Sequence, residues 1–250
     1  DLFSDIFTDT RVTLPDPSDS AAVKGNERMI SVIAAAIRDR ERPLRDDLLV
    51  GFGLSRLRIS VSQSRAIVRE ARRRYRRHNA GRRFVENEFF STLALSHHSQ
   101  PVPENVRYQL RRDPRVVEAL ERMWPVLTPA QLLRDLFGSK ALISSAASEH
   151  LSEEDWLTLF RPRGESLSGY RWSDADVPLL DEAYLGLGPR LDRQRKARDP
   201  EVRTFGHIVV DETQDHTPMA LRMIARRSLN GSMTIVGDIA QATAPGAAAD

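Results

Sequence analysis

Two stretches of the chain decide its fold: Phe205-Gly-His-Ile-Val-Val-Asp-Glu-Thr-Gln-Asp215 and Met233-Thr-Ile-Val-Gly-Asp-Ile-Ala-Gln241. The apolar run 208–210 is too short for a helix and is flanked by turn-forming residues, which predicts a buried strand of a parallel sheet. Between the two stretches, residues 217–227 begin with Thr-Pro and carry apolar residues at helical spacing, which predicts a crossover helix. Residues 233–236 then predict the neighbouring strand. The pattern as a whole predicts a strand-helix-strand unit of an α/β domain.

Polar side chains follow both predicted strands at the point where open α/β sheets bind ligands. Asp211 is a candidate ligand of Mg²⁺, because this ion is held by one or two carboxylates together with phosphate oxygens. Glu212 is placed to orient and deprotonate an attacking water. After the second strand, Gly237 lets the backbone pass close to a ligand. Asp238 and Gln241 are expected to sense the γ-phosphate of a bound nucleotide.

The order Asp-Glu-x-Gln-Asp followed by Gly-Asp-x-x-Gln resembles motifs II and III of superfamily 1 helicases of the UvrD/Rep type. More specifically, the chain resembles the HelD branch, bacterial ATPases that bind RNA polymerase and release it from nucleic acid. This resemblance extends to four further segments: VKGNERM, HNAGRRFVENE, LRDLFGSKAL and WSDADVPLLDEA. It implies an α/β fold that is part of a RecA-like P-loop NTPase motor domain, with a Walker B strand and a large, mostly α-helical insertion.

The resemblance also implies roles for individual residues, with ATP and Mg²⁺ as cofactors. Asp211 would hold Mg²⁺ through a water, and Glu212 would be the catalytic base. Gln214 and Asp215 would couple ATP to the neighbouring motif, whereas Gln241 would contact the γ-phosphate.

A phosphate-binding loop is missing from the sequence. Such a loop has the pattern Gly-x-x-x-x-Gly-Lys-Ser/Thr, and none of Lys24, Lys140 and Lys196 is preceded by Gly and followed by Ser or Thr. The resemblance therefore predicts an internal part of a larger helicase-like protein, with the loop upstream and a second motor domain downstream. These 250 residues alone are not expected to hydrolyse ATP.

The part ahead of the motor strand is predicted to be mostly helical. Helices are expected over 23–40, 62–77, 79–95, 114–123, 129–137, from about 153 and over 173–185, with a hairpin at 48–61. A block of this length is far longer than a compact crossover. We therefore expect residues 1–200 to form a polymerase-engaging, clamp-opening insertion and residues 201–250 to belong to motor domain 1A. The first residues and the hairpin could join the motor sheet or the helices.

The composition of the chain limits the partners and the cellular compartment that we expect for it. The formal charge of +2 does not by itself indicate a nucleic-acid partner. Cysteine is absent, which excludes disulfides and fits a reducing cytosol. The six histidines lack the spacing of metal ligands, so no zinc is expected. No apolar stretch reaches the roughly 20 residues of a membrane span, and no signal peptide opens the chain. A cytoplasmic location and no membrane partner are therefore expected.

Arginine is concentrated between residues 65 and 83. Arg69, Arg72, Arg73, Arg76 and Arg77 are candidates for contacts with phosphates or with an acidic polymerase surface. The alternative is a solvated helix face without a partner.

Three functions stay open at this point. The leading hypothesis is part of an ATPase that binds RNA polymerase, releases it from nucleic acid and recycles it. One alternative is a UvrD-like 3′–5′ DNA helicase or repair translocase, with DNA as the partner. The other is a non-catalytic polymerase-binding module.

Overall fold

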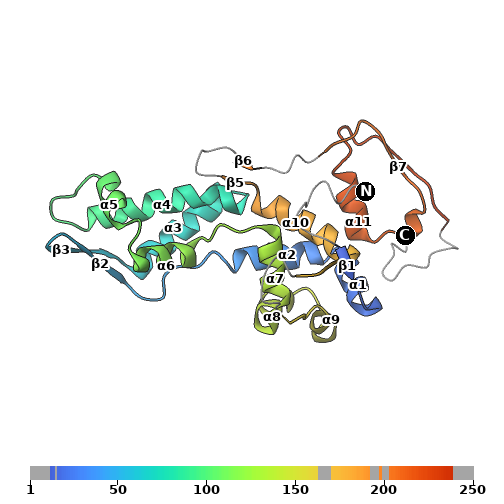
Figure 1. Cartoon of the computed structure of the whole chain (residues 1–250), viewed down its shortest axis with the longest axis horizontal. Helices are drawn as coiled ribbons and strands as arrows, with labels where there is room; N and C mark the ends of the chain where they lie inside the picture. The colour runs from blue at the N-terminus through green and yellow to red at the C-terminus, as the bar shows by residue number, and fades with distance from the viewer. Residues whose placement is uncertain (1–11, 15, 163–169, 192–196, 199–202, 239–250) are drawn as a thin grey trace. The chain divides into compact units, whose positions relative to one another are not determined.

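The structure is a computed structural model that describes residues 12–14, 16–162, 170–191, 197–198 and 203–238. These residues form a mixed α/β structure that is mostly helical and has short strands (Figure 1). The chain divides into two compact units. The first unit comprises Asp1–Ala36, Thr128–Leu185 and Lys196–Asp250, and the second comprises Ile37–Leu127 and Gly186–Arg195.

The second unit is built on a hairpin and four helices. Its elements are β2 (Leu48–Phe52), β3 (Ser55–Ile59), α3 (Val61–Arg74), α4 (His78–Leu95), α5 (Pro103–Leu110) and α6 (Pro114–Met123). The predicted hairpin is confirmed: β2 and β3 pair in antiparallel fashion, with Leu48 opposite Ile59 and Phe52 opposite Ser55. It shares a core with these helices and forms a sheet of its own.

Trp124 is a buried residue of that core. Its side chain is 1% exposed, its indole N–H donates to the carbonyl of His78 at 2.7 Å, and its ring stacks on the imidazole of His78. A Cβ at position 81 would lie 2.8 Å from the Trp124 ring. Gly81 is therefore the residue that lets α4 approach the indole this closely.

The first unit combines helices with two short parallel strand pairs. Its elements, with two helices that contain the division points, are β1 (Val12–Leu14), α1 (Ser18–Gly25), α2 (Met29–Arg38), α7 (Pro129–Phe137), α8 (Lys140–Ala147), α9 (Glu153–Thr158), β4 (Trp172–Ser173), η1 (Asp174–Asp176), α10 (Val177–Leu187), β7 (Ile208–Val210), η2 (Thr213–Asp215), α11 (Pro218–Ala225) and β8 (Met233–Ile235). Two further strands, β5 (Arg190–Leu191) and β6 (Ala197–Arg198), lie in the segment between α10 and β7.

The single helix predicted over 23–40 is wrong, because α1 and α2 are separate helices. The amide of Asn26 ends α1 by donating to the carbonyl of Val23 at 3.2 Å. Its side-chain oxygen accepts from the amide of Arg28 at 2.9 Å, just before α2 begins. A short polar side chain that bonds to the nearby backbone competes with continuation of a helix.

Two helices were not predicted. α5 begins at Pro103, and proline at the first helical position is favourable because it needs no hydrogen-bond acceptor there. α8 is capped by Ser139, whose hydroxyl accepts from the amide of Leu142 at 3.4 Å.

A buried charge cluster joins distant parts of the first unit. The ammonium of Lys24 lies 2.7 Å from Asp16 and 3.0 Å from Asp176, and the Arg161 guanidinium lies 2.9 Å from Asp176. The side chains of Lys24 and Asp176 are fully buried. Burial alone would raise the pKa of Asp176, but the charges of Lys24 and Arg161 outweigh it, so this pKa lies below its ordinary value.

We expect Asp176→Asn to destabilise the first unit by about 3–5 kcal/mol at neutral pH, because two cations lose their shared carboxylate. The Asp176 contribution is complete above the unfolded-state pKa of about 3.9 and is lost as the pH falls through the lower, folded-state pKa. The difference between wild type and variant should therefore shrink at acidic pH. Urea unfolding from pH 7 to pH 2 measures this. The exposed Asp19→Asn control should stay within about 0.5 kcal/mol of wild type.

Candidate functional site

The predicted strand-helix-strand unit is present in the first unit. β7 and β8 pair in parallel, with Ile208 opposite Met233 and Val210 opposite Ile235, and α11 connects them. Thr217 caps α11 by accepting from the amide of Ala220 at 3.3 Å. Because the strands are parallel, the residues that follow them meet at one edge of the sheet. We call residues 211–215 and 236–238 the carboxyl-edge loops.

Hydrogen bonds tie the two carboxyl-edge loops to each other. The amide and hydroxyl of Thr213 both donate to the carbonyl of Val236, at 3.1 and 3.0 Å. The side-chain oxygen of Gln214 accepts from the amide of Asp238 at 2.9 Å, while its amide nitrogen donates to the Glu212 carboxylate at 2.5 Å. Gln214 is 5% exposed. One buried amide side chain therefore connects the acidic residue after β7 to the backbone after β8.

Gly237 is required by this close approach. A Cβ at position 237 would lie 2.5 Å from the side-chain oxygen of Gln214 and 3.1 Å from the backbone nitrogen of Thr213. The sequence predicted that Gly237 gives room to a ligand. The structure shows that it gives room to the protein's own Gln214.

The two acids stand open to solvent at this edge. Asp211 accepts the amide of Glu212 at 2.9 Å through one carboxylate oxygen, and both side chains are exposed. The backbone of Glu212 is left-handed, with φ +51° and ψ +44°. This conformation is held by the carbonyl of Glu212, which accepts from the amide of Asp215 at 2.9 Å. A left-handed residue other than glycine is strained, which makes position 212 a candidate for a functional constraint.

The exposed carboxylates suit an ion held through water. Mg²⁺ keeps several waters and takes few protein ligands, so an accessible Asp211 fits such an ion. Within the ranges that the structure describes, no group of three or more histidine and acidic side chains is arranged to hold a metal.

Not every predicted site residue lies in this arrangement. Asp215 and Asp238 are exposed in the carboxyl-edge loops, whereas Gln241 lies outside the described residues. The arginine candidates belong to the second unit. There, Arg72 is occupied by Glu41 at 2.8 Å and Arg73 by Glu70 at 2.7 Å.

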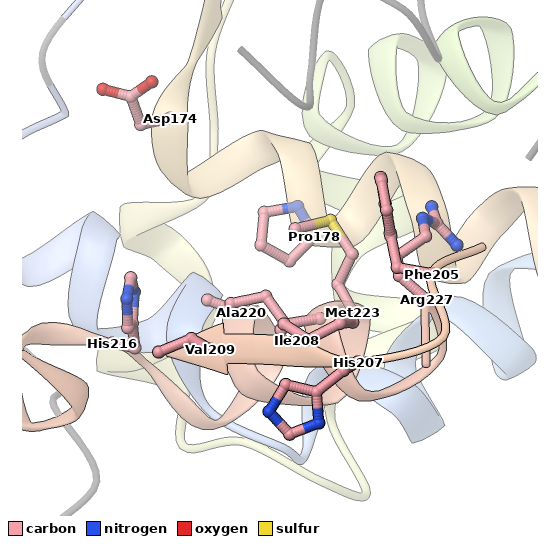
Figure 2. Close-up of a pocket in the computed structure, with 11 residues that line it drawn as sticks. Asp174, Pro178, Phe205, His207, Ile208, Val209, His216, Ala220, Met223 and Arg227 are labelled. Carbon is pink, nitrogen blue, oxygen red and sulfur yellow. The ribbon is translucent and has the colours of Figure 1, made fainter. Parts of the chain in front are cut away.

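A pocket of about 570 Å³ lies beside β7 (Figure 2). Its walls are mainly apolar and come from α10, β7 and α11, among them Pro178, Val209 and Met223. The acids of the carboxyl-edge loops do not line it. This pocket was not predicted from the sequence. A short apolar run predicts a strand, but it does not show which side chains of that strand are left uncovered by the neighbouring helices.

Ion pairs within the first unit join α11 and the two residues after it to Asp181 and Glu182 of α10. Arg222 lies 3.0 Å from Glu182, Arg226 pairs with Asp181 and Glu182, and Arg227 pairs with Asp181. Asp181, Glu182 and Arg227 are buried. These contacts fix the crossover helix that connects the two carboxyl-edge loops.

Among the described residues, no helix is both long enough and apolar enough to cross a membrane. A comparison with protein-family models and a comparison with curated proteins found no match to this chain.

We expect Gln214→Ala to break the link between Glu212 and Asp238, while the hydrogen bonds of Thr213 to Val236 remain. The amide of Asp238 loses its acceptor and should exchange its hydrogen about tenfold faster or more, because a bond worth about 1.4 kcal/mol protects tenfold. The amide of Val236, which donates to Val210 in the strand pair at 2.9 Å, is the internal control. Amide exchange measured by NMR tests this. Gly237→Ala should have a similar effect, and unchanged protection at Asp238 in both variants would contradict the bridging role.

Proposed function

We propose that the carboxyl-edge loops form the metal-facing and γ-phosphate-facing part of an ATPase motor of the HelD type. In the complete activity, ATP turnover would release RNA polymerase from nucleic acid and recycle it. The observation that carries the proposal is the Gln214 bridge between Glu212 and the amide of Asp238. It joins the residues expected to act on water to those expected to sense the phosphate.

The chemistry assigned to the chain follows from this bridge. Mg²⁺, when bound, would neutralise charge on the phosphates. Asp211 would hold the waters of that ion, and Glu212 would orient the attacking water and accept its proton. Gln214 limits the freedom of the Glu212 carboxylate by donating to one of its oxygens. A displacement of Asp238 would therefore change the position of the base.

The exposed apolar strand residues support a larger parallel sheet. Among the described residues, β7 and β8 each pair with one strand only. Val209 is 66% exposed and Ile235 is 58% exposed. Parallel sheets in proteins are covered on both faces, so additional strands and helices are expected around this pair. That is the arrangement proposed here, a RecA-like motor domain in which a phosphate-binding loop faces the carboxyl edge.

The second unit would supply the partner contacts. Its hairpin and helices form a core separate from the carboxyl-edge loops, as a polymerase-engaging part of the protein would. A bacterial polymerase partner places the proposed activity in the cytoplasm.

The test is Glu212→Gln in the intact protein that contains these residues. This change keeps the size of the side chain and removes the base, so we expect the kcat for ATP hydrolysis to fall by about 10²–10⁴. Binding of ATP should persist, and release of stalled polymerase should be lost. Glu149→Gln, at an exposed acid of the first unit, is the matched control and should leave the rate unchanged.

Other outcomes identify the competing functions. Release of polymerase that persists when hydrolysis is abolished would indicate a non-catalytic binding module. Unwinding of a duplex with a 3′ single-stranded tail, without any polymerase present, would indicate a helicase. A normal hydrolysis rate in the Glu212→Gln protein would refute the assignment of the base.

A further inference from the structure

The charge of the second unit is concentrated in α3 and the start of α4. Residues 61–83 contain nine arginines and a single acid, Glu70, which gives a formal charge of +8. The whole chain carries only +2. A local excess of this size creates a positive potential that the total charge conceals.

Two of the nine arginines are committed to the fold. Arg72 donates to the carboxylate and the carbonyl of Glu41 and to the carbonyl of Arg38. Arg82 lies 2.7 Å from Glu86 and 2.9 Å from Glu121. It also donates to the carbonyl of Leu120 in α6 and to that of Trp124 just after α6. Both side chains therefore serve internal contacts.

Arg73 and Arg74 share one partner. They lie 2.7 and 2.5 Å from Glu70, a half-buried residue of α3. A hydrogen bond from Arg73, and a smaller contribution from the hydrogen bond of Arg74, lower the pKa of Glu70 to about 2. This carboxylate is therefore ionised at neutral pH. One negative charge between two guanidinium groups leaves this trio with a net positive charge.

The remaining five arginines are exposed, and no ion pair or hydrogen bond joins their side chains to other residues that the structure describes. They are Arg65, Arg69, Arg76, Arg77 and Arg83. We call these five, together with Arg73 and Arg74, the arginine surface.

The arginine surface is regular along α3. Arg65, Arg69 and Arg73 follow each other at four-residue spacing, and the buried residues Ser64 and Val68 occupy a different side of the helix. Four residues correspond to a rise of about 6 Å. Three arginines are therefore attached to neighbouring turns on one side of the helix at even intervals, and Arg76 and Arg77 follow shortly after the helix ends.

We propose that the arginine surface binds the phosphate backbone of a nucleic acid. A line of evenly spaced cations is complementary to a strand whose charges repeat at a fixed interval. The planar guanidinium group also matches phosphate oxygens with two parallel hydrogen bonds. An acidic protein surface would not require such regularity, so nucleic acid is the partner that the spacing favours.

The proposed contact recognises the charge of the phosphates and not the sequence of the bases. Tyr75 and Phe84 pack on each other with ring centroids 5.8 Å apart, and the Arg74 guanidinium lies 4.9 Å from the Phe84 ring. The aromatic faces at this surface are thus used within the protein and are not a platform for stacked bases. Affinity should be similar for strands of different sequence, and it should fall steeply with salt.

The experiment measures binding of the full chain to a fluorescently labelled mixed-sequence duplex, and to a single strand of the same length, as a function of salt. The test variant is Arg65→Gln/Arg69→Gln/Arg76→Gln. On the duplex, the slope of log affinity against log salt should lose about 0.9 per arginine removed, hence about 2.7 in total. On the single strand, the loss should be about 2.

The matched control is Arg56→Gln/Arg111→Gln/Arg112→Gln. These arginines are exposed in the same unit, and the variant has the same net charge as the test variant. It should keep most of the wild-type slope. Glu70→Gln should tighten binding several-fold at equal salt, because it releases Arg73 and Arg74 and removes the one acid of the surface.

Three results would overturn the proposal. The first is no binding of the wild type at about 50 mM salt, and the second is equal weakening of binding by the test and control variants. The third is a test variant that loses affinity for RNA polymerase while its nucleic-acid binding is unchanged. The last result would assign the surface to an acidic protein partner. None of these measurements involves ATP, so their outcome is independent of the role of Glu212.

Discussion

The side-chain amide of Gln214 is the contact on which the candidate site depends. It accepts from the backbone after β8 and donates to the carboxylate after β7, so one side chain links Glu212 to Asp238, beside the hydrogen bonds of Thr213 to Val236. A glutamine can do this because its amide has both a donor and an acceptor end. Its burial matters as well, since a hydrogen bond shielded from water is harder to replace.

Charged contacts hold the helix that connects the two carboxyl-edge loops. α11 links the two strands, and its arginines pair with Asp181 and Glu182 of α10. Removal of one partner from a buried pair leaves an uncompensated charge, which costs far more than a surface pair contributes. α11 is therefore held by contacts that do not tolerate partial loss. The cluster around Lys24 and Asp176 applies the same principle elsewhere in the first unit.

The sequence predicted the strand-helix-strand unit and its parallel direction, because short apolar runs and a Thr-Pro helix start are local signals. It also predicted the hairpin and most of the helices. The interruption at Asn26 depends on a single side chain that bonds to the neighbouring backbone, so helical periodicity concealed it.

Contacts between residues distant in sequence were not predictable. Arg72 looked like its neighbours in an arginine-rich segment, yet its partner Glu41 lies 31 positions earlier in the chain. The reason for Gly237 likewise became clear only when Gln214 was found beside it. Whether a side chain serves the fold or a partner is decided by such long-range pairs, which a single sequence does not display.

The left-handed backbone at Glu212 has a consequence for how this position evolves. Glycine adopts that conformation without penalty, and asparagine does so more readily than most residues, so selection for folding alone would favour either of them here. A glutamate in this geometry adopts a backbone conformation that costs free energy relative to glycine or asparagine. Replacement of Glu212 by glycine would therefore relieve this backbone cost and remove the carboxylate in the same step.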